Sequence, residues 1–230
     1  MKALLFGSIG SIVETSELQR LAFNEAFHQH GLNWDWDRPF YASMLGASGG
    51  AARIAQYSIL QQEKVDAKAI HATKTAIFQE TLRTTPPSAR PGVLDTIKFA
   101  KWLGLTLGFI STTAHATIET ILENVEGLSP DTFDIVTSAD IGLLPKPSPE
   151  IYTHTLFKLG LSPKEALAIE DNEAGLWSAK SAGIPTVSFF GALTSEQDSM
   201  ISNWRADGDV FPVIQAAVNS ALETRERQVA

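Results

Sequence analysis

The sequence predicts an α/β fold in which a parallel sheet carries helices on both faces and an all-helical segment follows the first strand. A short apolar run over residues 3–6 leads into a small-residue turn at residues 7–11. Residues 16–86 show helical periodicity without a strand-like run. Beyond the Pro-rich segment 84–92, strand-like and helix-like stretches alternate. Such alternation is typical of a parallel sheet.

The first half of the chain supplies one strand and the helical segment. Apolar residues at helical spacing predict a helix over residues 16–30, which Gly31 ends. Further helices are predicted over 40–45, 51–62 and 66–83, the last with Asp66 as its N-cap. The strand at 3–6 finds no partner within this segment, so we expect it to join the later sheet. The predicted organisation is a core of residues 1–15 and 88–230 and a helical cap of residues 16–87.

The second half supplies the other strands. Strands are predicted over 105–110, 133–136, 166–169, 186–190 and 209–211, and a short helical turn is predicted at 161–163. Helices are predicted over 93–103, 117–123, 150–159, 173–182 and 212–223. Arg90, in the Pro-rich segment, is interpreted either as a hinge residue or as a solvated linker charge.

Composition excludes several classes of function. Hydrophobic residues make up 44% of the 230 residues, enough for a sizeable buried core. A net charge of −8 without a run of Lys or Arg argues against nucleic acid or an anionic membrane as partner. The absence of cysteine excludes disulfides, thiol catalysis and Cys-ligated metals. With no leader-like or membrane-spanning apolar stretch, a cytoplasmic protein is expected.

Polar residues follow several predicted strands, where ligands bind in open parallel sheets. Ser111 and Thr112 follow one strand, Lys146 lies beyond the next, and Glu170 and Asp171 follow a third. Each alone has an ordinary structural explanation: a helix cap, a solvated lysine, or carboxylates at a helix N-terminus. Together, hydroxyls and an ammonium suit a phosphate, and paired carboxylates suit Mg²⁺. The joint placement therefore favours a phosphate site.

Longer motifs around these residues resemble one family. Three segments of this chain are similar to signature motifs of that family: Lys146–Tyr152, Glu170–Gly175 with the following helix, and Ser111–Thr113. The chain resembles the haloacid dehalogenase superfamily, and most of all the branch of xylulose-bisphosphate phosphatase, phosphoglycolate phosphatase and β-phosphoglucomutase. The resemblance implies a Rossmann-like core with a helical cap, and Mg²⁺-dependent phosphoryl transfer.

The resemblance also identifies what this chain lacks. In the family, the first Asp of an Asp-x-Asp-Gly-Thr turn attacks phosphorus and binds Mg²⁺, and the second acts as acid and base. Gly7 and Ile9 stand at these two positions. The implied phosphate site comprises Ser8, Ile9, Ser111, Thr112 and Lys146. The implied Mg²⁺ site, weakened by the missing aspartate, comprises Asp171, Glu170 and the Ile9 carbonyl. The implied contacts from the cap to the substrate are Arg53 and Lys74.

Three functional hypotheses remain open. The first is a catalytically impaired relative that binds a phosphorylated metabolite or phosphate, as a sensor or partner subunit. The second is an active phosphatase with rearranged chemistry, using Ser8 or Ser11 as nucleophile or Glu14 as base. The third is an interaction protein that contacts a protein partner through Trp34 and Trp36 in the cap; the alternative is that both pack within the cap.

Overall fold

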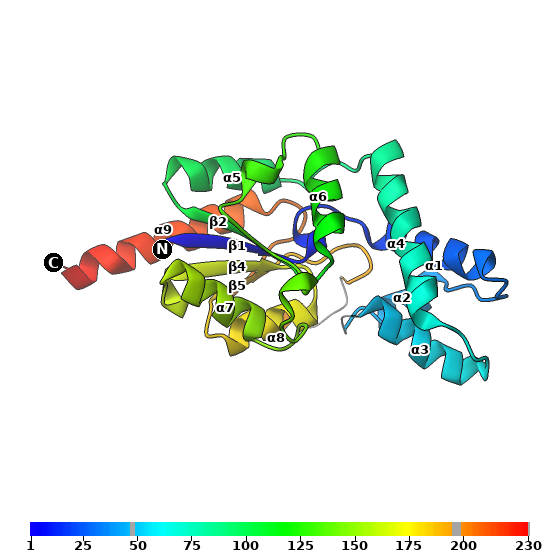
Figure 1. Cartoon of the computed structure of the whole chain (residues 1–230). Coiled ribbons are helices and arrows are strands. Elements are labelled where there is room, and N and C mark those ends of the chain that lie inside the picture. The colour runs from blue at the N-terminus through cyan, green and yellow to red at the C-terminus, as the bar shows by residue number, and fades with distance from the viewer. Residues whose placement is uncertain (47–48, 195–198, 230) are drawn as a thin grey trace.

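The sheet is the centre of the computed structural model. Within the described residues, 1–46, 49–194 and 199–229, six parallel strands pair in the order β3-β2-β1-β4-β5-β6. The central strand β1 (Ala3–Gly7) lies between β2 (Thr106–Ile110) and β4 (Ala166–Glu170) (Figure 1). The outer strands are β3 (Ile135–Thr137), β5 (Thr186–Ser188) and β6 (Trp204–Arg205). The predicted α/β class is therefore confirmed, and the strand at residues 3–6 joins the sheet as expected.

Helices cover both faces of the sheet because alternate side chains of β1 point to opposite sides. Leu4 and Phe6 belong to the apolar cluster beneath α5 (Val93–Trp102), α6 (His115–Asn124) and α9 (Phe211–Val229). Ala3 and Leu5 belong to the opposite cluster, against α7 (Glu150–Leu159) and α8 (Glu173–Ser181). By the same alternation Gly7, the last residue of β1, faces the side of α7.

The four helices between β1 and α5 lie beyond the carboxyl ends of the strands (Figure 1). They are α1 (Ser16–Gln29), α2 (Arg38–Ser43), α3 (Gly50–Gln61) and α4 (Ala67–Thr84). The Asp66 carboxylate accepts hydrogen bonds from the backbone N–H groups of Lys68 and Ala69, so the predicted N-cap is confirmed.

An aromatic cluster joins these helices. The Trp36 ring lies 4.9 Å from Phe23 and 4.8 Å from Phe27, centroid to centroid, and Trp34 packs on Phe27 at 5.3 Å. Only 4% of Trp34 and none of Trp36 is exposed. The interpretation of these tryptophans as partner contacts is therefore wrong, because both rings are used inside the protein.

The last predicted strand is also wrong. The Asp209 carboxylate accepts the backbone N–H of Phe211 at 2.9 Å, so residues 209–211 lead into α9. The edge strand lies earlier, at Trp204–Arg205. Short 3₁₀ turns complete the described chain at Ile9–Ser11, Pro130–Thr132, Ala139–Ile141, Pro163–Glu165 and Ser199–Ile201. No helix in the described ranges has the length and apolar character needed to cross a bilayer.

Arg90 connects the two segments that join the helices α1–α4 to the sheet. Its backbone N–H donates to the Ile12 carbonyl, in the outgoing segment, at 2.8 Å. Its guanidinium donates to the carbonyls of Gly10, Phe189 and Phe190 and lies 3.4 Å over the Phe189 ring. Arg90 is thus a bonded structural residue and not a solvated linker charge.

Candidate functional site

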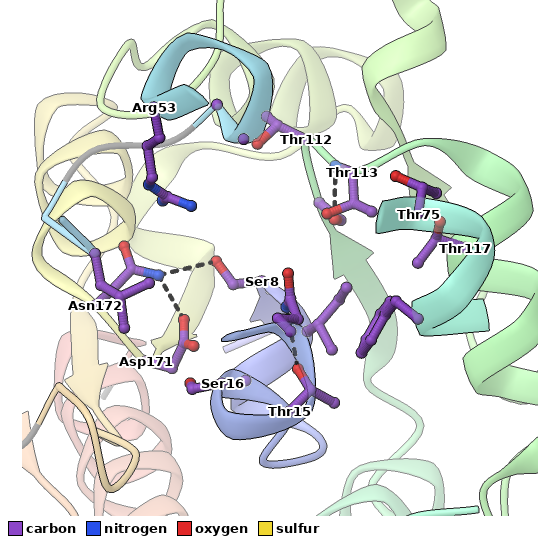
Figure 2. A pocket seen from close by; sticks show the side chains of 18 of the residues that line it. Ser8, Thr15, Ser16, Arg53, Thr75, Thr112, Thr113, Thr117, Asp171 and Asn172 are labelled. Atoms are coloured by element: carbon purple, nitrogen blue, oxygen red, sulfur yellow. Dashed lines mark hydrogen bonds between the residues drawn. The ribbon is translucent and has the colours of Figure 1, made fainter. Parts of the chain in front are cut away.

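A cavity of about 380 Å³ lies between the carboxyl ends of the strands and the helices α1–α4. Figure 2 shows Ser8 near its centre, with Asp171 and Asn172 on one side and Thr112 and Thr113 across from them. The sequence-predicted residues that line it are Ser8, Ile9, Ser111, Thr112, Lys146, Asp171, Arg53 and Lys74. Residues separated by more than 100 positions along the chain thus meet at one site.

Glu170 occupies the space beside Gly7. A Cβ atom built on Gly7 would overlap the Glu170 carboxylate and the Tyr152 hydroxyl. One carboxylate oxygen, Oε1, accepts the Tyr152 hydroxyl at 2.5 Å and the Lys146 ammonium at 2.7 Å. The other, Oε2, accepts the Ser8 hydroxyl at 3.1 Å. Glu170 is fully buried and does not line the cavity. Burial and this carboxylate raise the pKa of Tyr152 well above its usual value, so the phenol stays a donor.

Lys146 is placed where its ammonium reaches both the sheet and the cavity. Its Nζ donates to the Ile110 carbonyl at 2.9 Å and lies 3.5 Å from Ser8 Oγ. Only 3% of its side chain is exposed, and the ion pair with Glu170 balances its charge. A buried charge needs such a partner. The ammonium is therefore held in position whether or not a ligand is bound.

Ser8 has an unusual backbone at the end of β1. Its φ of 54° lies in the region that side-chain-bearing residues rarely adopt, and such conformations concentrate at functional sites. Its N–H donates to the Ile110 carbonyl at 3.2 Å, so this amide is used by the sheet. Within the implied phosphate site, the backbone N–H of Ser8 is therefore already bonded within the protein. The hydroxyl is the part of Ser8 that faces the cavity, with Asn172 Nδ2 at 3.4 Å.

Ser111 and Thr112 follow β2 at the cavity wall. The Ser111 hydroxyl accepts the backbone N–H of Thr113 at 3.1 Å, as in a local turn. Its amide donates to Thr137 Oγ1 on β3 at 3.1 Å. The N-cap of α6 is Ala114, without a side-chain cap bond, so the helix-cap interpretation of Ser111 and Thr112 is wrong. Both residues line the cavity.

The three predicted metal donors all have hydrogen-bond partners within the protein. The Ile9 carbonyl already accepts the N–H groups of Ile12 and Val13, both at 2.9 Å. Glu170 is committed to Lys146, and Asp171 remains at the cavity with Asn172 Nδ2 at 2.7 Å. Burial first, and the Glu170 charge second, raise the pKa of Asp171 to about 7. Among the described residues, no three or more His, Asp or Glu side chains gather as metal ligands.

The opposite wall carries cations from the helices. Arg53 Nε on α3 donates to the Met44 carbonyl at 3.1 Å. Lys74 Nζ on α4 donates to Gln19 Oε1 at 2.9 Å and lies 4.7 Å from the Phe23 ring centroid. Burial, with Arg53 nearby, lowers the pKa of Lys74 to about 7, and burial lowers that of Arg53 as well. Both predicted cap residues therefore face the cavity.

The residues proposed for rearranged chemistry separate into two groups. Ser11 is fully buried and donates to the Ser8 carbonyl at 2.9 Å, which removes it as a nucleophile. The Glu14 carboxylate accepts the N–H groups of Ser16 and Ala192, at 3.0 and 2.9 Å. It does not line the cavity and is structural. Ser8 remains.

Sequence reasoning missed four contributors to the site. Gln19 and His71 line the cavity from α1 and α4, and Asn172 bonds Ser8 and Asp171. Tyr152 holds Glu170 from α7. Asn172 and Tyr152 belong to the motifs around Glu170 and Lys146, which was the available signal. Gln19 and His71 occupy unremarkable helix positions, so no sequence signal marks them.

Comparisons with known proteins agree with this architecture. A model of the family described as haloacid dehalogenase-like hydrolase matches residues 10–189. Protein CbbY of Rhodobacter capsulatus is 34% identical over 226 residues, 96% of this chain and 97% of its own. The crystal structure of CbbY from Rhodobacter sphaeroides in complex with phosphate has a TM-score of 0.83 and 33% identity, over 90% of this chain and 94% of that one.

A mutant of the same Rhodobacter sphaeroides protein, in complex with xylulose-1,5-bisphosphate, also has a TM-score of 0.83, with 34% identity. It covers 90% of this chain and 94% of its own. The family model spans most of the chain, and the Rhodobacter capsulatus relative aligns with nearly all of it. The chain belongs to the haloacid dehalogenase-like hydrolase family.

Proposed function

We propose that this protein binds a phosphorylated small molecule in the cavity without turning it over by the family's aspartate chemistry. The observation that carries the proposal is the state of position 7. Gly7 supplies no nucleophile, and Glu170, paired with Lys146, fills the adjacent space. Ile9, where the family has its acid and base, is apolar and 6% exposed. Groups that act together in one mechanism lose most of their joint effect when one is removed.

Binding has separate support. Lys146 and the hydroxyls of Ser111 and Thr112 line one wall, and Arg53 and Lys74 line the other. Cations and hydroxyls are the groups that hold phosphate oxygens. The related CbbY structures contain phosphate and xylulose-1,5-bisphosphate. We therefore propose a sugar phosphate, with a core of residues 1–15 and 88–230 and a cap of residues 16–87 enclosing it.

Magnesium would bind more weakly here than in relatives with the aspartates. Mg²⁺ in such sites is held by one or two carboxylates together with phosphate oxygens and water. Asp171 is the carboxylate at the cavity, and its raised pKa reduces its charge at neutral pH. The residues present fit a Mg²⁺ ion only if the ligand's phosphate supplies further oxygens. Asp171 would be the residue that holds the ion, which would offset the negative charge of the phosphate.

Titration calorimetry and a phosphatase assay test the proposal together. We expect inorganic phosphate and xylulose-1,5-bisphosphate to bind, with no phosphate release from the bisphosphate in the presence of Mg²⁺. Thr112→Val should weaken binding roughly 3- to 10-fold by removing one hydrogen bond. Thr153→Val, at an exposed position of α7, is the matched control and should bind normally. Absence of binding at millimolar ligand, or multiple turnovers of the sugar phosphate, would contradict the proposal.

A further inference from the structure

The Ser8 hydroxyl and the Glu170 carboxylate form a pair that the family chemistry does not use. Ser8 Oγ lies 3.1 Å from Glu170 Oε2, within the range expected for a nucleophile and its general base. Ser8 lines the cavity, whereas Glu170 is fully buried behind it. The exposed member of the pair is therefore the hydroxyl, and the carboxylate can act only through it.

The surroundings of Ser8 suit an attacking oxygen. Ser8 directly follows the central strand and has a φ of 54°, and such strained positions persist where the surrounding structure fixes them. Lys146 Nζ lies 3.5 Å from Ser8 Oγ, and Asn172 Nδ2 lies 3.4 Å away. An ammonium and an amide donor at that distance would stabilise the oxygens of a phosphoryl group attached to Ser8.

The same turn limits which phosphoryl donors can react. When a sugar phosphate gives up its phosphoryl group, the sugar leaves as an alkoxide, which needs a proton from a general acid. Ile9 cannot supply one. When an acyl phosphate gives up its phosphoryl group, the leaving group is a carboxylate, which is stable as an anion at neutral pH and needs no proton. The turn therefore selects acyl phosphates over sugar phosphates as donors.

We propose that Ser8 accepts one phosphoryl group from an acyl phosphate, with Glu170 as general base. The bond between Ser8 Oγ and phosphorus forms while the bond between phosphorus and the acyl oxygen breaks. The electron pair of the broken bond leaves with the carboxylate. The Ser8 proton passes to Glu170 Oε2, which then donates it back to an oxygen of the new phosphoryl group.

The product is a long-lived phosphoserine. Its hydrolysis needs a base that activates water opposite Ser8, and position 9, from which the family's second aspartate acts, carries Ile9. The outcome is one phosphorylation per chain and no continuous turnover. This inference rests on the proposed function, since the donor must bind in the same cavity.

Intact-mass measurement of the full chain after incubation with acetyl phosphate tests the inference. We expect a gain of one phosphoryl group, assigned to Ser8 by fragmentation. Ser8→Ala should gain none. Ser8→Gly should also gain none, and glycine accommodates the positive φ, so this variant should fold. Glu170→Gln should react roughly 10²- to 10⁴-fold more slowly. Ser43→Ala, an exposed serine of α2 outside the cavity, is the control and should react as the wild type does.

Calorimetry with inorganic phosphate on the same samples separates the two proposals. A wild-type protein that binds phosphate but gains no mass from acetyl phosphate overturns the Ser8 inference alone. A phosphoryl group that still appears in Ser8→Gly overturns it as well. A protein that neither binds phosphate nor gains mass overturns both. Phosphate binding retained in Ser8→Gly, with labelling lost, supports both.

Discussion

The Glu170 carboxylate lies in the space that a side chain at Gly7 would fill, on the face of the sheet covered by α7. Phe6 pairs with Ile169 in adjacent strands, so the next residues of β1 and β4 meet side by side. The Glu170 carboxylate therefore fits in this position only because residue 7 has no side chain. This coupling changes what is needed to restore the family's chemistry.

Restoring the two aspartates alone should fail. In Gly7→Asp with Ile9→Asp, the new carboxylate meets Glu170, and two close carboxylates repel each other. Adding Glu170→Asp withdraws the second carboxylate by one methylene. We expect the triple variant to hydrolyse p-nitrophenyl phosphate with Mg²⁺ roughly 10²-fold faster than the double variant. Equal rates in the two variants would show that Glu170 moves aside freely.

Filling the space at Gly7 should destabilise the fold. In Gly7→Ala the added methyl overlaps Glu170 and Tyr152, and overpacking of this kind costs roughly 1–3 kcal/mol. Urea unfolding measures the change. Gly46→Ala is the matched control, because a Cβ there meets no atom within 4 Å. Its free energy of unfolding should stay within about 0.5 kcal/mol of the wild type. A loss equal to that of Gly7→Ala would rule out the steric explanation.

Arg53 should distinguish a bisphosphate from a single phosphate. It lines the cavity on α3, opposite the wall that carries Lys146. Replacing it with Met removes a charge-assisted hydrogen bond worth roughly 1.5–3 kcal/mol, equivalent to about 10- to 100-fold in affinity. We expect calorimetry to show this loss for xylulose-1,5-bisphosphate and a smaller one for inorganic phosphate. Arg83→Met, at an exposed position of α4, should bind both ligands normally. Equal losses for both ligands would place a lone phosphate at Arg53.

Lys74 should make stability depend on pH. Its pKa falls from 10.5 to about 7 on folding, so between these values the unfolded chain holds a proton that the folded chain lacks. Stability should therefore rise as pH increases from 7 toward 10, by up to about 1.4 kcal/mol for each pH unit. Urea unfolding at pH 7, 8 and 9 should show a shallower rise in Lys74→Met. Lys68→Met, exposed on the same helix, should keep the wild-type slope, and an unchanged slope in Lys74→Met would contradict the assignment.

Local sequence signals were sufficient to predict those elements whose own residues determine their structure. The helix predicted at 150–159 has the bounds of α7, and Asp66 caps α4 as its side chain predicts. The edge strand at Trp204–Arg205 was missed because two residues are too few to show an alternating pattern. Val210, in the middle of the misassigned segment 209–211, is buried without being in a strand.

Contacts distant in sequence could not be predicted. Motif spacing placed Glu170 with Asp171 as a metal ligand, whereas its rotamer is set by Tyr152, Lys146 and the absence of a side chain at Gly7. No spacing along the chain links Ser8 with a carboxylate 162 residues away, so the sequence does not pair Ser8 with Glu170. Only the pairing of β1 with β4 brings them together.

Arg90 holds both ends of the helical segment α1–α4 at one place. The two segments connecting the helices to the sheet are bonded to each other through Arg90 and Ile12, and the guanidinium holds Gly10 and Phe189. The segment that returns from α4 and the turn that carries Gly10 are therefore anchored by one side chain. Because Gly10 lines the cavity, the connection to the helices α1–α4 and this side of the cavity depend on the same residue.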